Sequence, residues 1–262
     1  MKPLKYALFG LIAAMAVQAP AFAQPAPNFN NAPPNAIRVL ATAAIKPPID
    51  AVMADAQKAI GKPIVIIYGS ARGNMRTAIL NDVDFDVALL VPDVDVQLLA
   101  AGKIKPRPRE VARAPIAIAI RGDKPADLNL KTTAGIRRAL INAKGVKYAP
   151  TGAALFTVRK ILDTLRLRPL INDLSTMPGT VVLNPGEYEI NIFPHSEIIP
   201  NKALQDQGLV IPALQVPADV TASISTKTRD PAGAQALVDF WLGPTIDPTL
   251  APVGMVKGRR GR

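Results

Sequence analysis

Cysteine is absent from the 262-residue chain, and histidine occurs only once, at His195. The lack of cysteine excludes disulfides and thiolate metal sites, and one histidine cannot supply a histidine pair for zinc. Aromatic residues make up only 5% of the chain, too few for a surface on which nucleic-acid bases stack. We therefore expect no metal, no other cofactor and no nucleic-acid partner.

The chain also lacks an apolar run that is long enough to span a bilayer comfortably. Its longest, "YALFGLIAAMAV" at residues 6–17, follows Lys2 and Lys5 and precedes "AFA" at residues 21–23. A basic start, a short apolar core and an A-x-A site are typical of a secretory signal peptide. We predict that residues 1–23 are cleaved and that the mature protein is periplasmic. A membrane anchor is the alternative.

The formal net charge is +11 at pH 7, but much of it lies at the two ends of the chain. Lys2 and Lys5 belong to the signal peptide. Four further cations occur in the last six residues: Lys257, Arg259, Arg260 and Arg262. The body between them keeps a mild positive bias, which favours small anionic partners. We predict that residues 257–262 form a solvated basic tail, with binding to anionic lipid as the alternative.

The remaining chain is organised as two α/β units. Residues 24–36, "QPAPNFNNAPPNA", are rich in proline and asparagine and are predicted to be a disordered leader. From Ile37 onward, apolar runs such as "PIVIIYG" and "FDVALLV" alternate with amphipathic helical segments. This alternation is typical of a parallel sheet with helices on both faces. The run "APIAIAI" from Ala114 indicates a strand that leaves the first sheet, and a second α/β unit follows it.

Strand-to-helix turns are the candidate binding features, because free N–H groups and the helix dipole at a helix start favour negative charge. Three of these turns contain hydroxyl or glycine residues: Thr42-Ala43-Ala44, Ser70-Ala71-Arg72-Gly73 and Thr151-Gly152-Ala153. Taken singly, each turn could be an ordinary helix N-cap. Two turns in the first unit and one in the second indicate a cleft between the units.

No catalytic constellation is evident. The stretch "GSARG" fails the G-x-S-x-G nucleophile motif because Ser70 directly follows Gly69. His195 is followed by Ser196 and Glu197, but neighbours on a strand point to opposite faces. We therefore do not expect an enzyme. A periplasmic hydrolase, the alternative, would need a second partner for His195.

Several segments resemble, in order and spacing, the extracytoplasmic solute-binding proteins of ABC importers that are similar to molybdate-binding proteins. They are "IRVLATAAI", "YGSARGNMRTAI", "FDVALLV", "PTGAALFTVRKIL", "GEYEINIFPHSEIIP" and "LVDFWLGPTIDPTLAPVGMV". The resemblance implies a type II periplasmic-binding-protein fold, in which each lobe is a mixed, mainly parallel sheet flanked by helices and two crossover strands join the lobes. Lobe 1 would comprise residues 37–113 and 200–256, and lobe 2 residues 114–199.

The resemblance also implies that serine hydroxyls and helix N-termini hold the ligand in the cleft. The family's first-turn serine falls on Ala44, near Thr42, and its paired serines fall on Ala71 and Arg72. The planar guanidinium of Arg72 suits a carboxylate or phosphate. The predicted ligand contacts are Thr42, Ala43, Ser70, Ala71, Arg72, Thr151, Gly152, Thr180 and Ser196.

The sequence thus predicts a monomeric, periplasmic solute-binding protein. It would capture a small oxyanion or carboxylate between its lobes and deliver it to an inner-membrane ABC permease. Hinges are expected at residues 113–115 and 196–200. The alternatives are a ligand-sensing protein that acts on a membrane receptor, a binding protein that has lost its ligand, and the hydrolase. Because most of the family's hydroxyls are replaced, the identity of the anion stays open.

Overall fold

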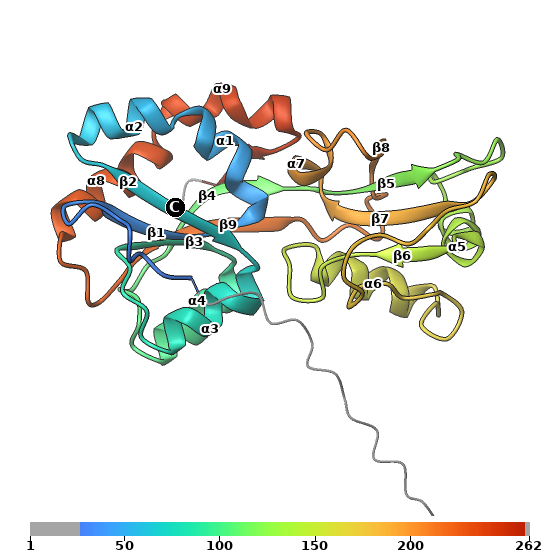
Figure 1. The fold of residues 1–262 in the computed structure, drawn as a ribbon, viewed down its shortest axis with the longest axis horizontal. Helices are drawn as coiled ribbons and strands as arrows, with labels where there is room; N and C mark the ends of the chain where they lie inside the picture. Colours follow the sequence, from blue (N-terminus) through green and yellow to red (C-terminus); the bar gives the residue numbers. More distant parts are fainter. Residues whose placement is uncertain (1–26, 260–262) are drawn as a thin grey trace, which may run out of the picture.

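A computed structural model describes residues 27–259. The predicted signal peptide and the last three residues of the tail lie outside this range. Figure 1 shows two lobes arranged along the longest axis, and each lobe contains one sheet flanked by helices. The predicted two-lobed α/β fold is confirmed.

The sheet of lobe 1 has six strands in the order β10-β4-β9-β3-β1-β2. They are β1 (Ile37–Thr42), β2 (Ile64–Gly69), β3 (Val87–Leu90), β4 (Arg109–Ala114), β9 (Ala218–Ile224) and β10 (Val256–Lys257). The parallel register of β1 and β2 pairs Thr42 with Gly69, so both strands end at the same edge. Two of the three predicted binding turns therefore begin side by side.

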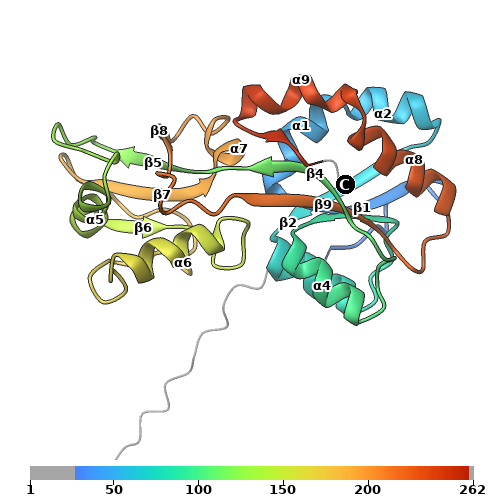
Figure 2. The ribbon, with the colours of Figure 1, turned by 180° about the vertical axis from the view of Figure 1, so that it is seen from behind.

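Helices cover both faces of the lobe 1 sheet (Figures 1 and 2). They are α1 (Lys46–Ala51), α2 (Met53–Ile60), α3 (Arg76–Leu80), α4 (Pro92–Ala100), α8 (Pro231–Leu242) and α9 (Asp247–Leu250). Alternate residues of β1 point to opposite faces, so Val39 joins the cluster that contains Trp241, whereas Leu40 joins the α3 and α4 side. Trp241 is only 1% exposed and acts as a core residue.

The sheet of lobe 2 has four strands in the order β6-β7-β5-β8. These strands and the lobe 2 helices are β5 (Ile116–Gly122), α5 (Thr133–Asn142), β6 (Gly145–Lys147), α6 (Leu155–Thr164), β7 (Tyr188–Pro194), α7 (His195–Ile198) and β8 (Gln205–Leu209). Apolar side chains of α5 and α6, such as Ile136 and Ile161, pack with Ile118 and Ile190 of the sheet. The short α7 covers the opposite face through Ile198.

The expectation of mainly parallel pairing is not met. Of the eight strand pairings between residues 27 and 259, five are antiparallel. In lobe 1 the reason is that strands which return from lobe 2 enter the sheet in the reverse direction. Strand β9, for example, lies between β3 and β4 and runs antiparallel to both. In lobe 2 the incoming strand β5 runs antiparallel to both of its neighbours, β7 and β8.

The lobe boundaries also differ from the predicted ones. The chain leaves lobe 1 at Pro115, between β4 and β5, inside the predicted segment 113–115. Because β8 completes the free edge of β5, lobe 2 continues to Leu209. The chain therefore returns to lobe 1 through residues 210–217, and not at residues 196–200 as expected.

Parts of the predicted tail and leader pack against lobe 1. Lys257 belongs to β10, and its ammonium donates to Gly243 O over 2.7 Å and pairs with Asp247, so it is part of lobe 1. Residues 27–36 lie in turns against lobe 1, where Phe29 packs on an apolar cluster and Phe29 O accepts from Ala32 N. These residues are therefore not the disordered leader that their composition predicted.

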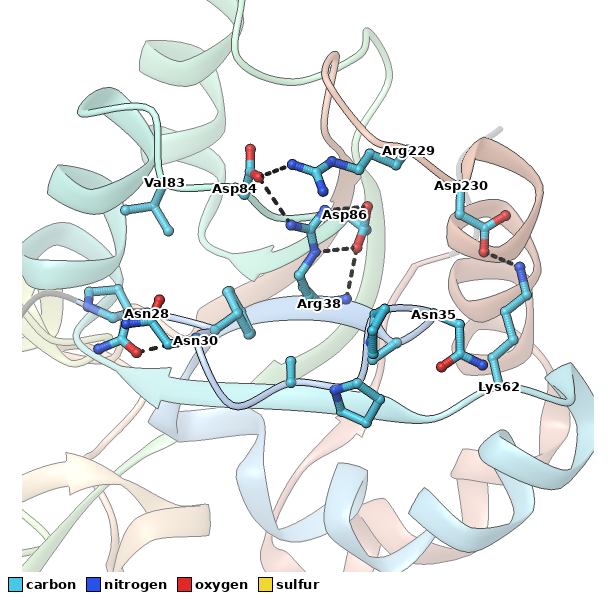
Figure 3. A pocket seen from close by; sticks show the side chains of 16 residues that line it. Asn28, Asn30, Asn35, Arg38, Lys62, Val83, Asp84, Asp86, Arg229 and Asp230 are labelled. Atoms are coloured by element: carbon cyan, nitrogen blue, oxygen red, sulfur yellow. Dashed lines mark hydrogen bonds and ion pairs between the residues drawn. The ribbon is translucent and has the colours of Figure 1, made fainter.

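Residues 27–36 also close a cavity of about 560 Å³ at the start of β1 (Figure 3). This is the opposite end of β1 from the predicted binding turns. The charged side chains that line the cavity form ion pairs with one another, among them Arg38 with Asp86 and Lys62 with Asp230. The cavity therefore offers no unpaired charge to a ligand.

Candidate functional site

The binding turns of the two lobes meet in direct contact. Ser70 lies between β2 and the helical turn η2 (Ala71–Met75), and Thr151 lies between β6 and α6. The Ser70 hydroxyl donates to Thr151 O over 2.7 Å, and its oxygen also lies 2.7 Å from Thr151 Oγ1. The backbone N–H of Arg72 donates to the same carbonyl over 3.1 Å. Two donors of lobe 1 thus converge on one oxygen of lobe 2.

The side chain of Arg72 strengthens this contact. Its Nε and Nη2 donate to the two carboxylate oxygens of Asp93, at 2.8 and 2.7 Å, and its Nη1 donates to Gly152 O over 2.7 Å. Its guanidinium carbon also lies 4.4 Å from the centroid of the Phe156 ring. Arg72 therefore joins the lobes through Gly152 while Asp93, in its own lobe, balances its charge. We call Ser70, Arg72, Thr151 and Gly152 the latch.

Gly73 allows the lobes to approach at the latch. A Cβ at this position would lie 2.8 Å from Thr151 Oγ1 and 2.9 Å from Ser70 Oγ, closer than real contacts allow. The backbone donors of the same turn are used within it, because Ser70 N donates to Asn74 Oδ1 and Gly73 N donates to Ser70 O. The backbone N–H of Arg72 therefore remains free to bond lobe 2, beside the side chains of Ser70 and Arg72.

A cavity of about 220 Å³ lies beside the latch, between the lobes. Its lining combines Arg72, Asp93 and Asp219 of lobe 1 with Phe156 of lobe 2. Asp219 is paired with Arg113, so both carboxylates have a cationic partner. Asp93 and Phe156 are not among the ligand contacts that the sequence predicts. Asp93 could have been found, because it follows β3 at the strand edge where β1 also ends.

The first predicted turn, Thr42-Ala43-Ala44, is not part of the latch. Thr42 is 2% exposed, and its side chain does not cap the helical turn that follows it, whereas Ala43 is half-buried. The next residue, Ala44, accepts a hydrogen bond from the hydroxyl of Ser196 over 2.7 Å. This bond connects α7 of lobe 2 with lobe 1. Because Ser196 is fully buried, it does not face a ligand. We call this bond the hinge contact.

Two further predicted contacts lie away from the latch. The methyl of Ala71 is fully buried in the lobe 1 core, so only its backbone is near the cleft. Thr180 is exposed in a loop of lobe 2, whose carbonyls at Gly179 and Val181 accept from Lys147 and Arg121. The structure therefore brings Ser70, Arg72, Thr151 and Gly152 together and leaves Thr180 apart from them.

The only histidine is engaged outside the latch. Its Nε2 lies 2.7 Å from Asp206 Oδ2, and its ring packs against Gly254 of lobe 1. Among the described residues no hydroxyl forms a hydrogen bond with this ring, so no nucleophile and base pair is present there. Nearby, burial raises the pKa of the Glu197 carboxyl to about 7. This carboxyl has no ion pair within the part of the chain that the structure describes.

Between residues 27 and 259, no three histidine or acidic side chains gather as metal ligands would. In the same range, no helix combines the length and apolar character that crossing a membrane requires.

The fold is shared with solved binding proteins. A periplasmic molybdate-binding protein from Azotobacter vinelandii is 16% identical, with 85% of this chain and 100% of that chain covered and a TM-score of 0.63. The sulfate-binding protein SubI from Mycobacterium tuberculosis H37Rv is 14% identical, with 84% and 86% covered and a TM-score of 0.65. The tungstate-binding protein TupA from Desulfovibrio alaskensis G20 is 14% identical, with 86% and 99% covered and a TM-score of 0.59. At these identities the likeness shows the fold alone.

Comparison with curated protein sequences gives no significant match. The family model for bacterial extracellular solute-binding proteins, however, matches residues 37–256, which is most of the chain. Together with the two-lobed fold, this match shows that the chain belongs to the bacterial extracellular solute-binding protein family.

Proposed function

We propose that the protein captures a small oxyanion or carboxylate between its lobes and delivers it to an ABC permease of the inner membrane. The observation that carries the proposal is the convergence of Ser70 Oγ and Arg72 N on the carbonyl oxygen of Thr151. Both donors come from a strand-to-helix turn, and both already hold an oxygen acceptor. An oxygen of an anionic ligand can take the place of Thr151 O when the lobes separate.

In this proposal the latch competes with the ligand. The donors that would hold an anion are satisfied by lobe 2, so a ligand enters only when the latch is broken. The apparent affinity is then the intrinsic affinity multiplied by the fraction of molecules that are open. The ligand replaces the latch by contacting both lobes, and its binding energy selects the closed form around it.

Asp93 sets the electrostatics of the proposed site. Its bidentate pair with Arg72 neutralises the cation that would otherwise attract the anion most strongly. Only 11% of the Arg72 side chain is exposed, so the pair is partly shielded from solvent screening. The site thus relies on the hydroxyl and N–H donors, and Arg72 becomes available to the ligand only if Asp93 releases it.

A calorimetric and thermal-shift screen tests the proposal. The chain from residue 24 would be titrated with molybdate, tungstate, sulfate, phosphate and small carboxylates. A ligand at 100 times its Kd stabilises the folded state by about 2.7 kcal/mol. For a protein of this size we expect a rise in Tm of roughly 5–10 °C. Absence of a shift with every anion would contradict the proposal.

Matched variants locate the binding. Ser70→Ala should weaken the affinity for the anion because a donor is lost, whereas Thr180→Ala, in the distant loop, should leave it unchanged. If both variants bind as the unchanged chain does, the anion binds elsewhere.

The proposal includes export and delivery. The family is extracellular, and we propose that residues 1–23 direct export to the periplasm, where the protein acts as a monomer. Mass measurement of the exported protein checks cleavage after Ala23. Loss of cellular uptake of the identified anion, when the gene is deleted, checks delivery to a permease. Unchanged uptake would favour a sensing role.

A further inference from the structure

Two basic segments that are far apart in the sequence meet at one end of lobe 1. The first, "KPRPR" at residues 105–109, leads into β4. Lys105, Arg107 and Arg109 line a cavity of about 260 Å³. The rest of the lining comes from Pro106, β9 and α8 and includes no carboxylate. This end of β4 is opposite to the end that continues into lobe 2 (Figure 2).

The second basic segment is the end of the chain. Strand β10 runs antiparallel to β4, with Val256 opposite Arg113, so residues further along the chain lie nearer to the start of β4. Gly258 N donates to Val111 O over 3.0 Å. A Cβ on Gly258 would lie 2.6 Å from Glu110 O, so the two backbones run in contact. Arg259 follows directly, and the sequence continues with Arg260, Gly261 and Arg262.

We call Lys105, Arg107, Arg109 and Arg259 the basic surface. Within residues 27–259 none of the four has a carboxylate at ion-pair distance. Glu110, the acidic residue between the segments, lies 3.4 Å from Arg113.

Two carboxylates in the turns near the basic surface are already balanced. Asp82 pairs with both Lys103 and Lys227. Asp84 pairs in the same way with Arg38 and Arg229. The positive charge of the basic surface is therefore not compensated from the neighbouring turns.

We propose that the basic surface docks the protein on an anionic phospholipid membrane. Arginine and lysine side chains without acidic partners are complementary to a layer of phosphate head groups. The lining of the cavity has no aromatic side chain, so it lacks the aromatic residues that are enriched at the centre of protein interfaces. Because the surface lies away from lobe 2, docking leaves the latch accessible. This inference does not depend on the ligand of the cleft.

Vesicle cosedimentation tests the proposal with the chain from residue 24. Vesicles of phosphatidylcholine with about 30% phosphatidylglycerol should bind the protein, and phosphatidylcholine alone should not. Each cation near an anionic surface changes binding roughly fivefold, so Lys105→Gln/Arg107→Gln/Arg109→Gln should weaken it roughly 100-fold. Binding should also fall as salt is added. A second variant, Arg259→Gln/Arg260→Gln/Arg262→Gln, tests the chain end if the first fails to fold.

The matched control removes the same charge from lobe 2. Arg137, Arg159 and Lys160 are exposed on α5 and α6, and Arg137→Gln/Arg159→Gln/Lys160→Gln should bind within about threefold of the unchanged chain. An equal loss in the control and in the basic-surface variant would show that only net charge matters, which overturns the proposal. Equal binding to both kinds of vesicle, or full binding by both basic-surface variants, also overturns it. Release of the protein by submillimolar inorganic phosphate would identify a soluble-anion site instead.

Discussion

The latch and the hinge contact use the same bond in two different surroundings. In each, a serine hydroxyl of one lobe donates over 2.7 Å to a backbone carbonyl of the other: Ser70 to Thr151 and Ser196 to Ala44. Ser70 and Thr151 are accessible to water, whereas Ser196 and Ala44 are fully buried. When the latch breaks, water replaces both partners. When the hinge contact breaks, a buried carbonyl is left without a donor.

This difference indicates which contact opens and which persists. Other bonds reinforce the hinge side, where His195 N donates to Pro115 O and Gln215 bonds both the N–H and the carbonyl of Ile116. These bonds hold both crossover segments together. The lobes can therefore separate at the latch while the hinge side stays intact.

The largest expected effect is the pH dependence caused by Glu197 on the hinge side. Its pKa is about 7 in the folded protein and about 4.5 when unfolded, so the folded state binds more protons between these values. The contribution of Glu197 to stability therefore falls as the pH rises from 4.5 to 7. Glu197→Gln should remove this fall, a gain of at most about 3 kcal/mol at pH 8.

Urea unfolding of both proteins from pH 4.5 to pH 8 measures this effect. Burial also raises the pKa of Asp95 to about 7, but this residue is present in both proteins, so its contribution cancels in the difference. Two parallel stability curves would show that Glu197 is not responsible.

The next effect is the loss of the hinge contact itself. Ser196→Ala removes the donor to Ala44 O and leaves that carbonyl buried and unpaired, which should lower the free energy of unfolding by about 2 kcal/mol. Chemical denaturation measures it, with Ser70→Ala as the matched serine on the latch side. A loss of the same size in both variants would abolish the distinction between the two contacts.

A smaller effect is expected for the charge at the latch. Asp93→Asn removes the anion that pairs with Arg72, so the guanidinium attracts an anionic ligand more strongly. We expect about fivefold tighter binding, or about 1 kcal/mol, by calorimetry. Asp163→Asn, an exposed carboxylate on α6 of lobe 2, is the control and should not change the affinity. Unchanged or weaker binding by Asp93→Asn would show that Arg72 does not contact the ligand.

The smallest effect on stability is expected for the latch serine. Because Ser70 is solvent-accessible, Ser70→Ala should change the free energy of unfolding by less than about 0.5 kcal/mol. It should, however, shift the ligand-free protein toward the open form. Small-angle scattering would detect this as a larger radius of gyration, and an unchanged radius would mean that Ser70 does not hold the lobes closed.

The features that could be predicted from the sequence are those that depend on residues close together in the chain. The apolar runs around Ile64 and Val87 and the turns after them are local features, so the sequence predicts the two α/β units and the three candidate binding turns. Strand β8 was not assigned to lobe 2, since "QDQGL" has little apolar pattern and is defined by its pairing with β5. Asp93 and Phe156 could not be predicted from local pattern because their roles depend on Arg72, which is distant from both in the sequence. Asp93 pairs with its guanidinium, and Phe156 stacks on it.

The sequence by itself determined the family, the two-lobed α/β architecture and the placement of Ser70, Arg72 and Thr151 at strand ends. Only the tertiary structure decided that these residues bond to one another, that Asp93 balances Arg72, and that Ser196 is buried at the hinge. The physical reason is that the periodicity of strands and helices depends on residues that are close together in the sequence. The partner of a hydroxyl or a charge, by contrast, depends on how distant segments pack.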